Sequence, residues 1–532
     1  MSVRACRVSA DRPPISSPGP GKNVEERSSV THGSGPAAAP SQTQPPPSTK
    51  RLFFTVFPSI MLPMFMAMGD QTIVASALPA IAGALGEVER VSWIVVAYLV
   101  AVTLAAPVYG YLGDLFGRRR LMFIALGIYI TASMASAFAP TLPLLALCRF
   151  CQGLGGGGLM ALSQALIGEA VPPRQRGQFQ GYLAAIGVSA SAFGPVMGAF
   201  LSEQFGWRAV FFVNVPTGFI AVLLTMRLTA RPGNRRAGWH FDLMGLVYFA
   251  CVVVPVLFSL DLIRRFDGSL APLILGMLAF ALVALVLLIR RESQIDSPLI
   301  PVKLLRQAAI WRADLMAVCH GATLVSLISF MPIYLRVVRQ ATSGQISYIL
   351  LSITAGIGLG SVITGRIVTR TGKTMIFPSI GMMIATCTLV LFAMISPQLT
   401  VPQLAGVLVL NSFSLGSVMG VIQVTVQTAA GPNALGKAAS SVQLSRSVGA
   451  SLGTAIIGTI LFATLAWRDP EAAGLFGAIM QSGPAALAGL TPERQAIVTA
   501  EVAHSFRAAF LTLACFTTIG SILAWTNPMR RV

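Results

Sequence analysis

Long apolar runs alternate with short polar segments along almost the whole chain from residue 52 onward. An α-helix needs about 20 apolar residues to cross the hydrocarbon core of a bilayer, so each run predicts a membrane-spanning helix. We expect the segment 466–505 to be a loop or a short amphipathic hairpin. The expected spans are fourteen, near residues 52–79, 91–112, 121–139, 141–167, 179–202, 209–228, 243–262, 270–289, 313–334, 346–366, 375–396, 401–428, 438–465 and 506–526.

Composition agrees with this pattern, since 54% of the residues are hydrophobic and only 11% are charged. A chain of this kind is too apolar for a soluble globular fold, and we predict an all-α polytopic membrane protein. The net charge of +19 would suit nucleic acid if the 38 Lys and Arg residues formed one surface. They are scattered through short loops instead, so no nucleic-acid partner is expected.

Basic residues concentrate in alternate loops, beginning with the three arginines at 118–120. Loops rich in Lys and Arg stay on the cytoplasmic side, and this rule places both termini in the cytoplasm. We therefore expect a multi-pass protein of the cell inner (plasma) membrane. Residues 1–50 are rich in Pro, Ser, Gly and Ala and lack the apolar surface that a folded domain needs, which predicts a disordered cytoplasmic tail.

Catalytic and metal-binding signatures are not found in the sequence. The seven Cys have no metal-site spacing, and only four His occur. No zinc-protease, Ser/His/Asp or nucleotide-binding motif is present. We predict no enzyme activity, no cofactor and no metal site, so any transport would be driven by a gradient rather than by ATP.

One polar segment, Gly110–Leu121 with the sequence GYLGDLFGRRRL, joins two uncharged apolar runs. Its glycines permit close approach of two helices and a tight turn, and its carboxylate stands near the C-terminal end of a helix, where the helix dipole does not favour it. The carboxylate therefore needs a cationic partner, which the following arginines supply. The segment resembles the loop between helices 2 and 3 of the major facilitator superfamily. This resemblance implies a conformational-switch loop made of Gly110, Gly113, Asp114, Gly117, Arg118 and Arg119.

A second segment, Gly365–Lys373, repeats the glycine and basic positions of the first but has no acid that matches Asp114. Such internal symmetry is typical of transporters built from two six-helix halves. We predict the major facilitator fold with two inserted helices. The expected domains are a tail at 1–50, an N-terminal half at 51–230, the inserted pair with its linkers at 231–311 and a C-terminal half at 312–532.

Two charged residues stand inside predicted spans, Asp70 in the first and Arg149 in the fourth. Charges in hydrocarbon are costly and usually mark an ion or proton pathway. At about 1.5 Å per residue both lie roughly 12 Å below the outer surface, so direct contact or a shared water-filled cavity is expected. The surroundings of both residues resemble motifs of the 14-span drug:proton antiporters of the superfamily. The resemblance implies that Asp70 and Arg149 couple transport to protons.

The predicted fifth span carries small residues that end in a Gly-Pro pair. Such a pair kinks a helix, and small residues let another helix approach closely. The run resembles a signature that accompanies export in the antiporters, with Ala190 and Ala199 in place of two glycines. Packing without any directional meaning is the alternative. The expected motif residues are Gly181, Gly194, Pro195 and Gly198.

A substrate cavity in such a bundle should combine adaptable apolar walls with a few polar anchors. A lone histidine at the depth of His320 is more often packed through hydrogen bonds than part of a proton relay. Arg446 is a further buried cation with no acidic partner evident in the sequence. The candidates for the cavity lining are Tyr98, Gln152, Phe193, Met197, Asn214, His320, Phe330, Tyr334, Asn411 and Gln423.

The resemblance implies proton-coupled efflux of amphipathic, cationic or neutral drugs or toxic small molecules by alternating access. Export or import of a defined metabolite, such as a siderophore or an amino acid, is the alternative use of the same fold. A membrane enzyme or receptor is a different class, which the missing catalytic cluster and the lack of a sizeable soluble domain disfavour. The expected partners are a small-molecule substrate, protons and the lipid bilayer, and a periplasmic adaptor protein is a further candidate.

Overall fold

The computed structural model describes residues 54, 56–86, 91–229, 241–263, 270–295, 298–299, 302–475 and 489–531. Fourteen helices in these residues are long and apolar enough to cross a membrane, which confirms the predicted number. The regular secondary structure of the described part is helical, apart from one isolated β-bridge between Lys373 and Arg531. The predicted tail at 1–50 lies outside the described residues, and the predicted domain boundaries stay predictions.

The helices fall into two sets of six spans separated by one pair. The first set is α2 (Phe57–Leu85), α3 (Ser92–Phe116), α4 (Arg118–Phe138), α5 (Leu142–Ala170), α6 (Arg176–Phe205) and the consecutive helices α7 (Ala209–Phe212) and α8 (Asn214–Met226). The pair is α9 (Leu243–Ile263) and α10 (Ala271–Gln294). The last set is α12 (Ala308–Val337), α13 (Ser343–Thr371), α14 (Ile376–Ile395), α15 (Val401–Ala430), α16 (Leu435–Arg468) and α19 (Pro492–Thr526). Shorter elements are η3 (Pro173–Gln175), α11 (Val302–Leu305), η5 (Pro432–Ala434) and α17 (Pro470–Gly474).

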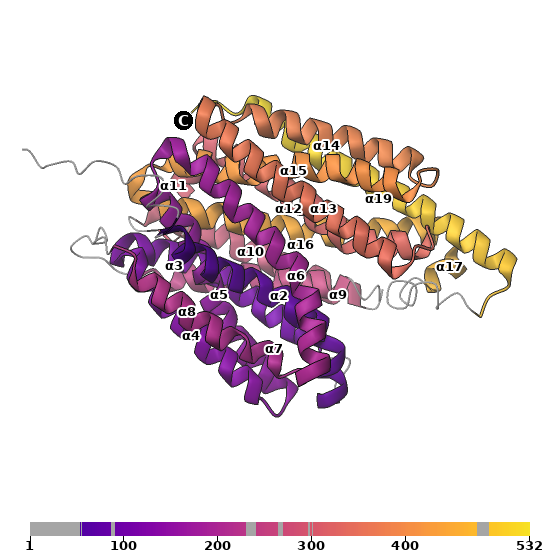
Figure 1. Cartoon of the computed structure of the whole chain (residues 1–532), viewed down its shortest axis with the longest axis horizontal. Helices are drawn as coiled ribbons and strands as arrows, with labels where there is room; N and C mark the ends of the chain where they lie inside the picture. Colours follow the sequence, from indigo (N-terminus) through magenta and orange to yellow (C-terminus); the bar gives the residue numbers. More distant parts are fainter. Residues whose placement is uncertain are drawn as a thin grey trace, which may run out of the picture. The chain divides into compact units, whose positions relative to one another are not determined.

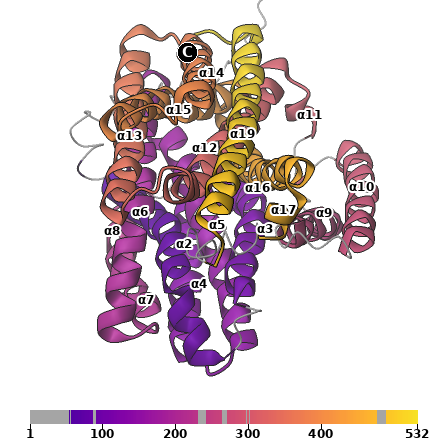
Figure 2. The same ribbon diagram turned by 90° about the vertical axis from the view of Figure 1, so that its right-hand side faces the viewer.

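Both sets pack their helices in the same order. In the first set α5 packs against α3 and α4, and α6 packs against α2. In the second set α15 packs against α13 and α14, and α16 packs against α12. The inserted helices α9 and α10 pack on each other at one side of the bundle, where α9 touches α3 and α16 (Figure 2). The arrangement is that of two six-helix halves with an added pair.

The two halves meet mainly through two helix pairs, α3 with α16 and α6 with α13, and α5 with α16 and α6 with α15 add smaller contacts. Figure 1 shows the halves converging near α11 and the C-terminus of the chain and separating toward α7 and α17. We call the end of the bundle that carries Gly110, Gly177, Gly365 and Gly436 the closed end, and the opposite end the open end. At the closed end an added Cβ on Gly177 would lie 3.1 Å from the Gly365 carbonyl oxygen, so the backbones of the two halves are in direct contact.

The last helix is longer than predicted, because α19 begins at Pro492 rather than near 506. Proline is favoured in the first turn of a helix, and the Thr491 hydroxyl caps the turn by accepting the N–H of Arg494. The segment 466–505 therefore contains α17 and the first turns of α19 instead of only a loop or short hairpin. Residues 476–488 of that segment lie outside the described part of the chain.

Candidate functional site

A buried polar network surrounds Asp70 on α2. Arg149 on α5 forms an ion pair with it, with 2.5 Å between Nη1 and Oδ2, and both residues are about 1% exposed. Gln152 and Asn214 donate side-chain N–H groups to the other carboxylate oxygen at 3.1 and 2.9 Å. Of the two arrangements expected from depth, direct contact is the one present. Neither charged residue lines the cavity between the halves that is described below.

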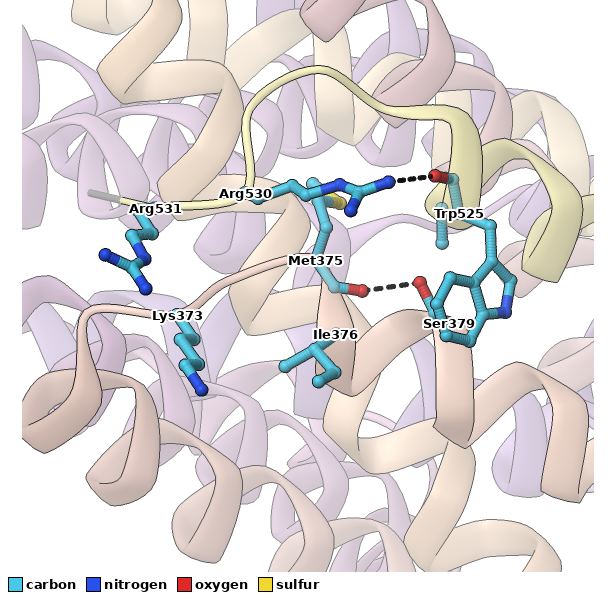
Figure 3. A pocket seen from close by; sticks show the side chains of 8 residues that line it. Lys373, Met375, Ile376, Ser379, Trp525, Arg530 and Arg531 are labelled. Carbon is cyan, nitrogen blue, oxygen red and sulfur yellow. Dashed lines mark hydrogen bonds between the residues drawn. The ribbon is translucent and has the colours of Figure 1, made fainter.

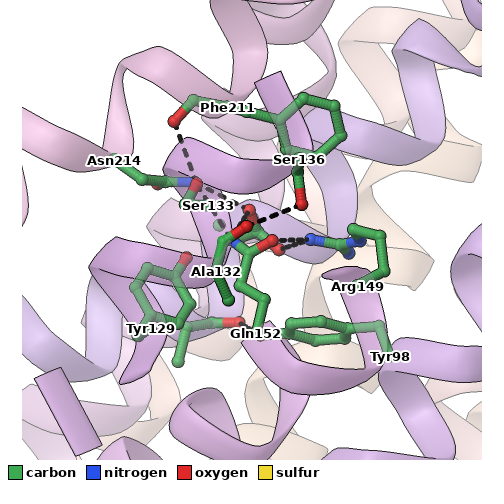
Figure 4. A network of polar contacts seen from close by, with 12 residues as sticks. Tyr98, Tyr129, Ala132, Ser133, Ser136, Arg149, Gln152, Phe211 and Asn214 are labelled. Atoms are coloured by element: carbon green, nitrogen blue, oxygen red, sulfur yellow. Dashed lines mark hydrogen bonds and ion pairs between the residues drawn. The ribbon is translucent and has the colours of Figure 1, made fainter. Parts of the chain in front are cut away.

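Ser133 on α4 links the polar side chains of this network (Figure 4). Its hydroxyl accepts hydrogen bonds from Gln152 at 3.2 Å and Asn214 at 3.1 Å, and it donates one to the Phe211 carbonyl oxygen at 2.9 Å. The carboxylate is therefore held by side chains from α5 and α8, and α4 fixes their amide groups. Four helices of the first half converge on one acid.

The guanidinium of Arg149 is enclosed as completely as the carboxylate. It lies over the ring of Tyr98 at 4.1 Å from the ring centre, and the Tyr98 hydroxyl donates to the Ala67 carbonyl oxygen at 3.1 Å. A buried ion pair is tolerated only while both charges are present, and loss of one partner costs about 3–5 kcal/mol. Protonation of Asp70 would remove one of the two charges, so proton binding and separation of the pair are physically linked.

At the closed end, Asp114 near the end of α3 reaches across to the start of α16. Its carboxylate accepts the backbone N–H groups of Gly436 at 3.0 Å and Lys437 at 3.2 Å. The unpaired N–H groups of a helix N-terminus carry partial positive charge and favour a carboxylate. Arg118 pairs with Asp114 at 2.5 Å and also with Glu169 on α5. The predicted cationic partner of Asp114 is therefore Arg118, and a second partner comes from the other half.

Three glycines of the switch segment meet different requirements. An added Cβ on Gly110 would lie 2.6 Å from the Gly436 carbonyl oxygen, and one on Gly113 would lie 2.9 Å from the Leu162 side chain. Gly117 joins α3 to α4 with φ at 91°, in the left-handed region that favours glycine. Close approach and a tight turn thus both occur in this segment.

The remaining arginines of the segment do not serve Asp114. Arg119 donates to the carbonyl oxygen of Met226 at 2.8 Å and so ties the start of α4 to the end of α8. Arg120 is exposed.

The contact between α6 and α13 repeats the α3–α16 geometry without a charge. Thr369 lies four residues after Gly365, as Asp114 lies four residues after Gly110. Its hydroxyl accepts the backbone N–H of Gln178, the third residue of α6, at 3.0 Å. Thr369 therefore fills the position at which the second segment has no acid, and the closed end combines one charged contact with one neutral contact.

The predicted antiporter motif lies along α6, which changes partner halfway. Gly181 faces the second half, where an added Cβ would lie 2.5 Å from the carbonyl oxygen of Ser361 on α13. Gly194 and Gly198 face α2, and an added Cβ at either would overlap its side chains. Pro195 lines the cavity between the halves. The motif residues thus let one helix contact the Asp70 helix, the cavity and the opposite half.

A cavity of about 560 Å³ lies between the halves, within the range of small-molecule sites. Its walls come from α2, α5 and α6 of the first half and from α12, α13, α15 and α16 of the second. Most of the lining side chains are aliphatic or Met. The polar lining residues are Gln164, Gln180, Ser191, His320, Ser347, Thr354, Gln423, Gln443 and Arg446.

None of the five cavity candidates from the first half lines this cavity, and their contact with a substrate stays a prediction. Phe193 and Met197 are exposed on α6. Met197 directly follows Pro195 and Val196, the last two residues of α6 that line the cavity. The other three have polar groups that are bonded in or around the network of Asp70: Tyr98, Gln152 and Asn214.

Two of the five candidates from the second half, His320 and Gln423, line the cavity. Tyr334 is buried in the apolar core of this half, and Phe330 packs against the same core. Asn411 is buried on α15, where it accepts a hydrogen bond from another side chain. Packing within the second half therefore accounts for the three of its candidates that do not reach the cavity.

Sequence analysis did not select Ser133 or Glu169. The only signal for Ser133 is a hydroxyl group within an otherwise mostly apolar span, and hydroxyls are common in buried helices because they bond to their own backbone. Glu169 stands at the end of α5, where it reads as an ordinary surface residue. Their contacts with Asn214 and Arg118 depend on tertiary structure.

A smaller hollow of about 210 Å³ lies at the closed end beside α14 and α19 (Figure 3). None of the predicted site residues lines it, and it is separate from the cavity between the halves. Its lining consists of Lys373, Met375, Ile376, Ser379, Ala524, Trp525, Arg530 and Arg531.

Comparison with known proteins identifies similar chains. An uncharacterized MFS-type transporter of Mycobacterium tuberculosis is 31% identical over 474 residues, covering 88% of this chain and 68% of the relative. The multidrug transporter protein MdtP of Bacillus subtilis is 28% identical over 405 residues, covering 76% of this chain and 74% of the relative. Among solved structures, the human organic anion transporter MFSD10 aligns with a TM-score of 0.59 at 15% identity, covering 88% of this chain and 98% of that one.

The family model of the Major Facilitator Superfamily matches residues 60–454. That range runs from the first span into α16 and includes both the Asp70 network and the closed-end contacts. The proton:xylose symporter XylE also shares the fold, with a TM-score of 0.58 at 13% identity over 90% of this chain and 97% of that one. The chain therefore belongs to the major facilitator superfamily, whose members are membrane transporters rather than enzymes.

Proposed function

We propose that this protein exports amphipathic small molecules across the cell inner membrane in exchange for protons. The observation that carries the proposal is the ion pair of Asp70 and Arg149, sealed inside the first half at 2.5 Å. Ionisable groups at such a depth are costly and usually serve an ion or proton pathway. The resemblance of α6 to the antiporter signature and the name of the Bacillus relative, a multidrug transporter, support export as the direction.

The orientation of the bundle in the membrane determines which step of the transport cycle the observed state represents. With the arginine-rich loops in the cytoplasm, the closed end faces the cytoplasm and the cavity faces outward. In this state exported substrate has left, and uptake of a proton by Asp70 from the outer side requires local opening of the sealed network. Neutral Asp70 no longer balances Arg149, so the guanidinium must find new partners and α2 must shift against α5.

A shift of α2 can be transmitted to the closed end through α6. Helix α6 packs on α2 along one part of its length and on α13 along another. Separation at α6–α13 and α3–α16 would open the cytoplasmic side and admit substrate. Release of the proton into the cytoplasm would restore the charge on Asp70 and return the pair to the observed contact.

The proton gradient is sufficient for this task. One proton that crosses about 100 mV and about one pH unit releases roughly 3.7 kcal/mol. For a neutral substrate this supports a concentration ratio of about 500-fold. One exchanged proton per molecule is therefore enough for effective export.

Everted membrane vesicles from a host that lacks its own pumps test the proposal. Vesicles with an acidic interior should accumulate amphipathic dyes, and Asp70→Asn should abolish accumulation that depends on the pH gradient. Asp242→Asn is the matched control, since Asp242 is also a buried carboxylate in an ion pair, with Arg291 at 2.9 Å, but lies directly before α9 of the inserted pair. Normal accumulation in the Asp70 variant, or equal loss in both variants, would contradict the assignment.

A further inference from the structure

The cavity between the halves carries positive charge and no negative charge. Arg446 is its one charged side chain, His320 lies nearby on α12, and the described residues that line the cavity include no Asp or Glu. The remaining polar lining groups are amides and hydroxyls, and amides can turn to present N–H donors. The side-chain nitrogens of Gln180 and Gln423 are buried without a hydrogen-bond partner in the described part of the chain.

Arg446 differs from the other enclosed arginines of the described residues. Arg118 and Arg149 pair with carboxylates, and Arg176 donates to the Gly168 carbonyl oxygen at 2.5 Å. Arg446 has neither an ion-pair partner nor a hydrogen-bond partner among the described residues, and it faces the cavity. It stands eleven residues into α16, about 16 Å from the helix start, too deep for its side chain to reach the headgroup region easily.

His320 adds a second group of adjustable charge. Its Nε2 donates to the Leu415 carbonyl oxygen at 3.1 Å, which leaves Nδ1 buried with no hydrogen-bond partner in the described chain. Arg446 lines the same cavity. An anion placed between the two residues would balance Arg446 and would also favour a proton on His320.

We infer that the cavity binds amphipathic organic anions, with a carboxylate or similar oxyanion on Arg446 and an apolar body against the aliphatic and Met walls. A guanidinium offers a planar fork of donors that matches two oxyanion oxygens. A cation in the same cavity would meet Arg446 without any opposing carboxylate. The inference deepens the proposed function and rests on it for the role of the cavity, and it replaces the expected cationic or neutral substrate by an anionic one.

An anionic substrate changes the electrical character of the exchange. One monovalent anion leaving for one proton entering moves two charges in the same sense, and a potential of about 100 mV favours that exchange roughly 2,000-fold. A monovalent cation exchanged for one proton gains nothing from the potential. Transport by this protein should therefore respond strongly to membrane potential.

Equilibrium binding to the purified full-length protein, with no ion gradient present, tests the inference. The probes are 1-naphthaleneacetate, its neutral amide and the corresponding amine, together with the same head groups on an anthracene body. We expect the carboxylates to bind at least tenfold more tightly than the amides, and the amines most weakly. The inference would be overturned if the carboxylates bound no better than their amides on either body. It would also be overturned if chloride competed with the probes while the protein showed no preference among their head groups.

Variants of Arg446 test whether its charge is responsible for the preference for carboxylates over amides. Arg446→Gln should remove the advantage of the carboxylate and leave amide binding intact, which also shows that the variant is folded. Arg446→Lys should keep part of the preference, since lysine offers a point charge without the planar fork. Arg468→Gln is the control, because Arg468 lies on the same helix, outside the cavity lining, and pairs with Glu501. A carboxylate preference that survives Arg446→Gln would place the anion elsewhere and refute the assignment.

Transport by the reconstituted protein separates this inference from the proposed function. A carboxylate preference in binding together with no response of flux to a pH gradient would uphold the anion site and remove proton exchange. Export of cationic dyes driven by a pH gradient and unaffected by membrane potential would uphold proton exchange and remove the anion site.

Discussion

Replacing Asp114 by alanine should open the closed end of the bundle. The carboxylate accepts the N–H groups of Gly436 and Lys437 across the boundary between the halves. Hydrogen bonds to a charged group contribute about 1.5–3 kcal/mol each. The pairing with Arg118 lies within one half and persists when the halves separate, so only the contacts across the boundary count. Their loss weakens the closed state by about 3 kcal/mol, which raises the ratio of open to closed molecules about 150-fold.

The repeat provides a matched comparison at the other helix pair. Thr369 accepts one N–H from Gln178 at 3.0 Å in the corresponding position but carries no charge. A neutral hydrogen bond contributes about 1 kcal/mol, so Thr369→Val should raise the same ratio only about fivefold. The comparison tests the combined effect of the charge and the second hydrogen bond, because both residues lie at the same register relative to their glycines.

Distances between spin labels measure this ratio. Labels at the exposed positions Arg120 and Lys373, one on each half, report separation of the closed end in protein whose native cysteines have been replaced. Asp114→Ala should shift the distance distribution toward longer values far more than Thr369→Val does. Equal responses of the two variants, or no response to Asp114→Ala in folded protein, would refute the reasoning.

Further changes follow from the same structure. Gly181→Val should slow export by forcing α6 from α13, because a Cβ there would lie 2.5 Å from the Ser361 carbonyl oxygen, whereas Gly83→Ala, with no atom near, should leave export rates unchanged. Arg149→Ala should lower the melting temperature by leaving Asp70 unbalanced, at a cost of about 3–5 kcal/mol, and adding Asp70→Asn should restore stability but not proton-driven export. The Arg494 guanidinium holds the pKa of Asp469 below its ordinary value, so this contact stabilises the fold above the unfolded pKa and is lost as pH falls through the folded pKa. Asp469→Asn should therefore flatten the acid side of the melting temperature against pH.

The fold was predictable because the signals for it, apolar runs and a repeated segment, each lie within a short stretch of sequence. Apolar runs long enough to cross a bilayer marked fourteen spans, and the repeated segment at 365–373 indicated two halves. Where the apolar signal ended, the prediction failed, as in the first turns of α19. Those turns contain the charged residues Glu493 and Arg494, which lower the apolar signal, while the Thr491 cap and Pro492 start the helix.

The site was predictable where charge alone selects the residues. Asp70 and Arg149 are costly inside a membrane, and their equal predicted depth indicated a contact. The structure has that contact as an ion pair. The cationic partner of Asp114 was predictable but its partners in the other half were not, because backbone N–H groups 322 residues away carry no sequence signal. The lining of the cavity was only partly predictable, because it depends on which face each helix turns toward the other half, and of the ten candidates only His320 and Gln423 line it.

Proton movement in proteoliposomes tests the central claim most directly. A pH indicator inside vesicles that contain the purified protein reports proton flux when an outward or inward gradient of a transported compound is imposed. The account predicts that protons move opposite to the compound and that Asp70→Asn abolishes this movement while Asp242→Asn retains it. Protons that move with the compound, or that move equally well through Asp70→Asn, would contradict the account.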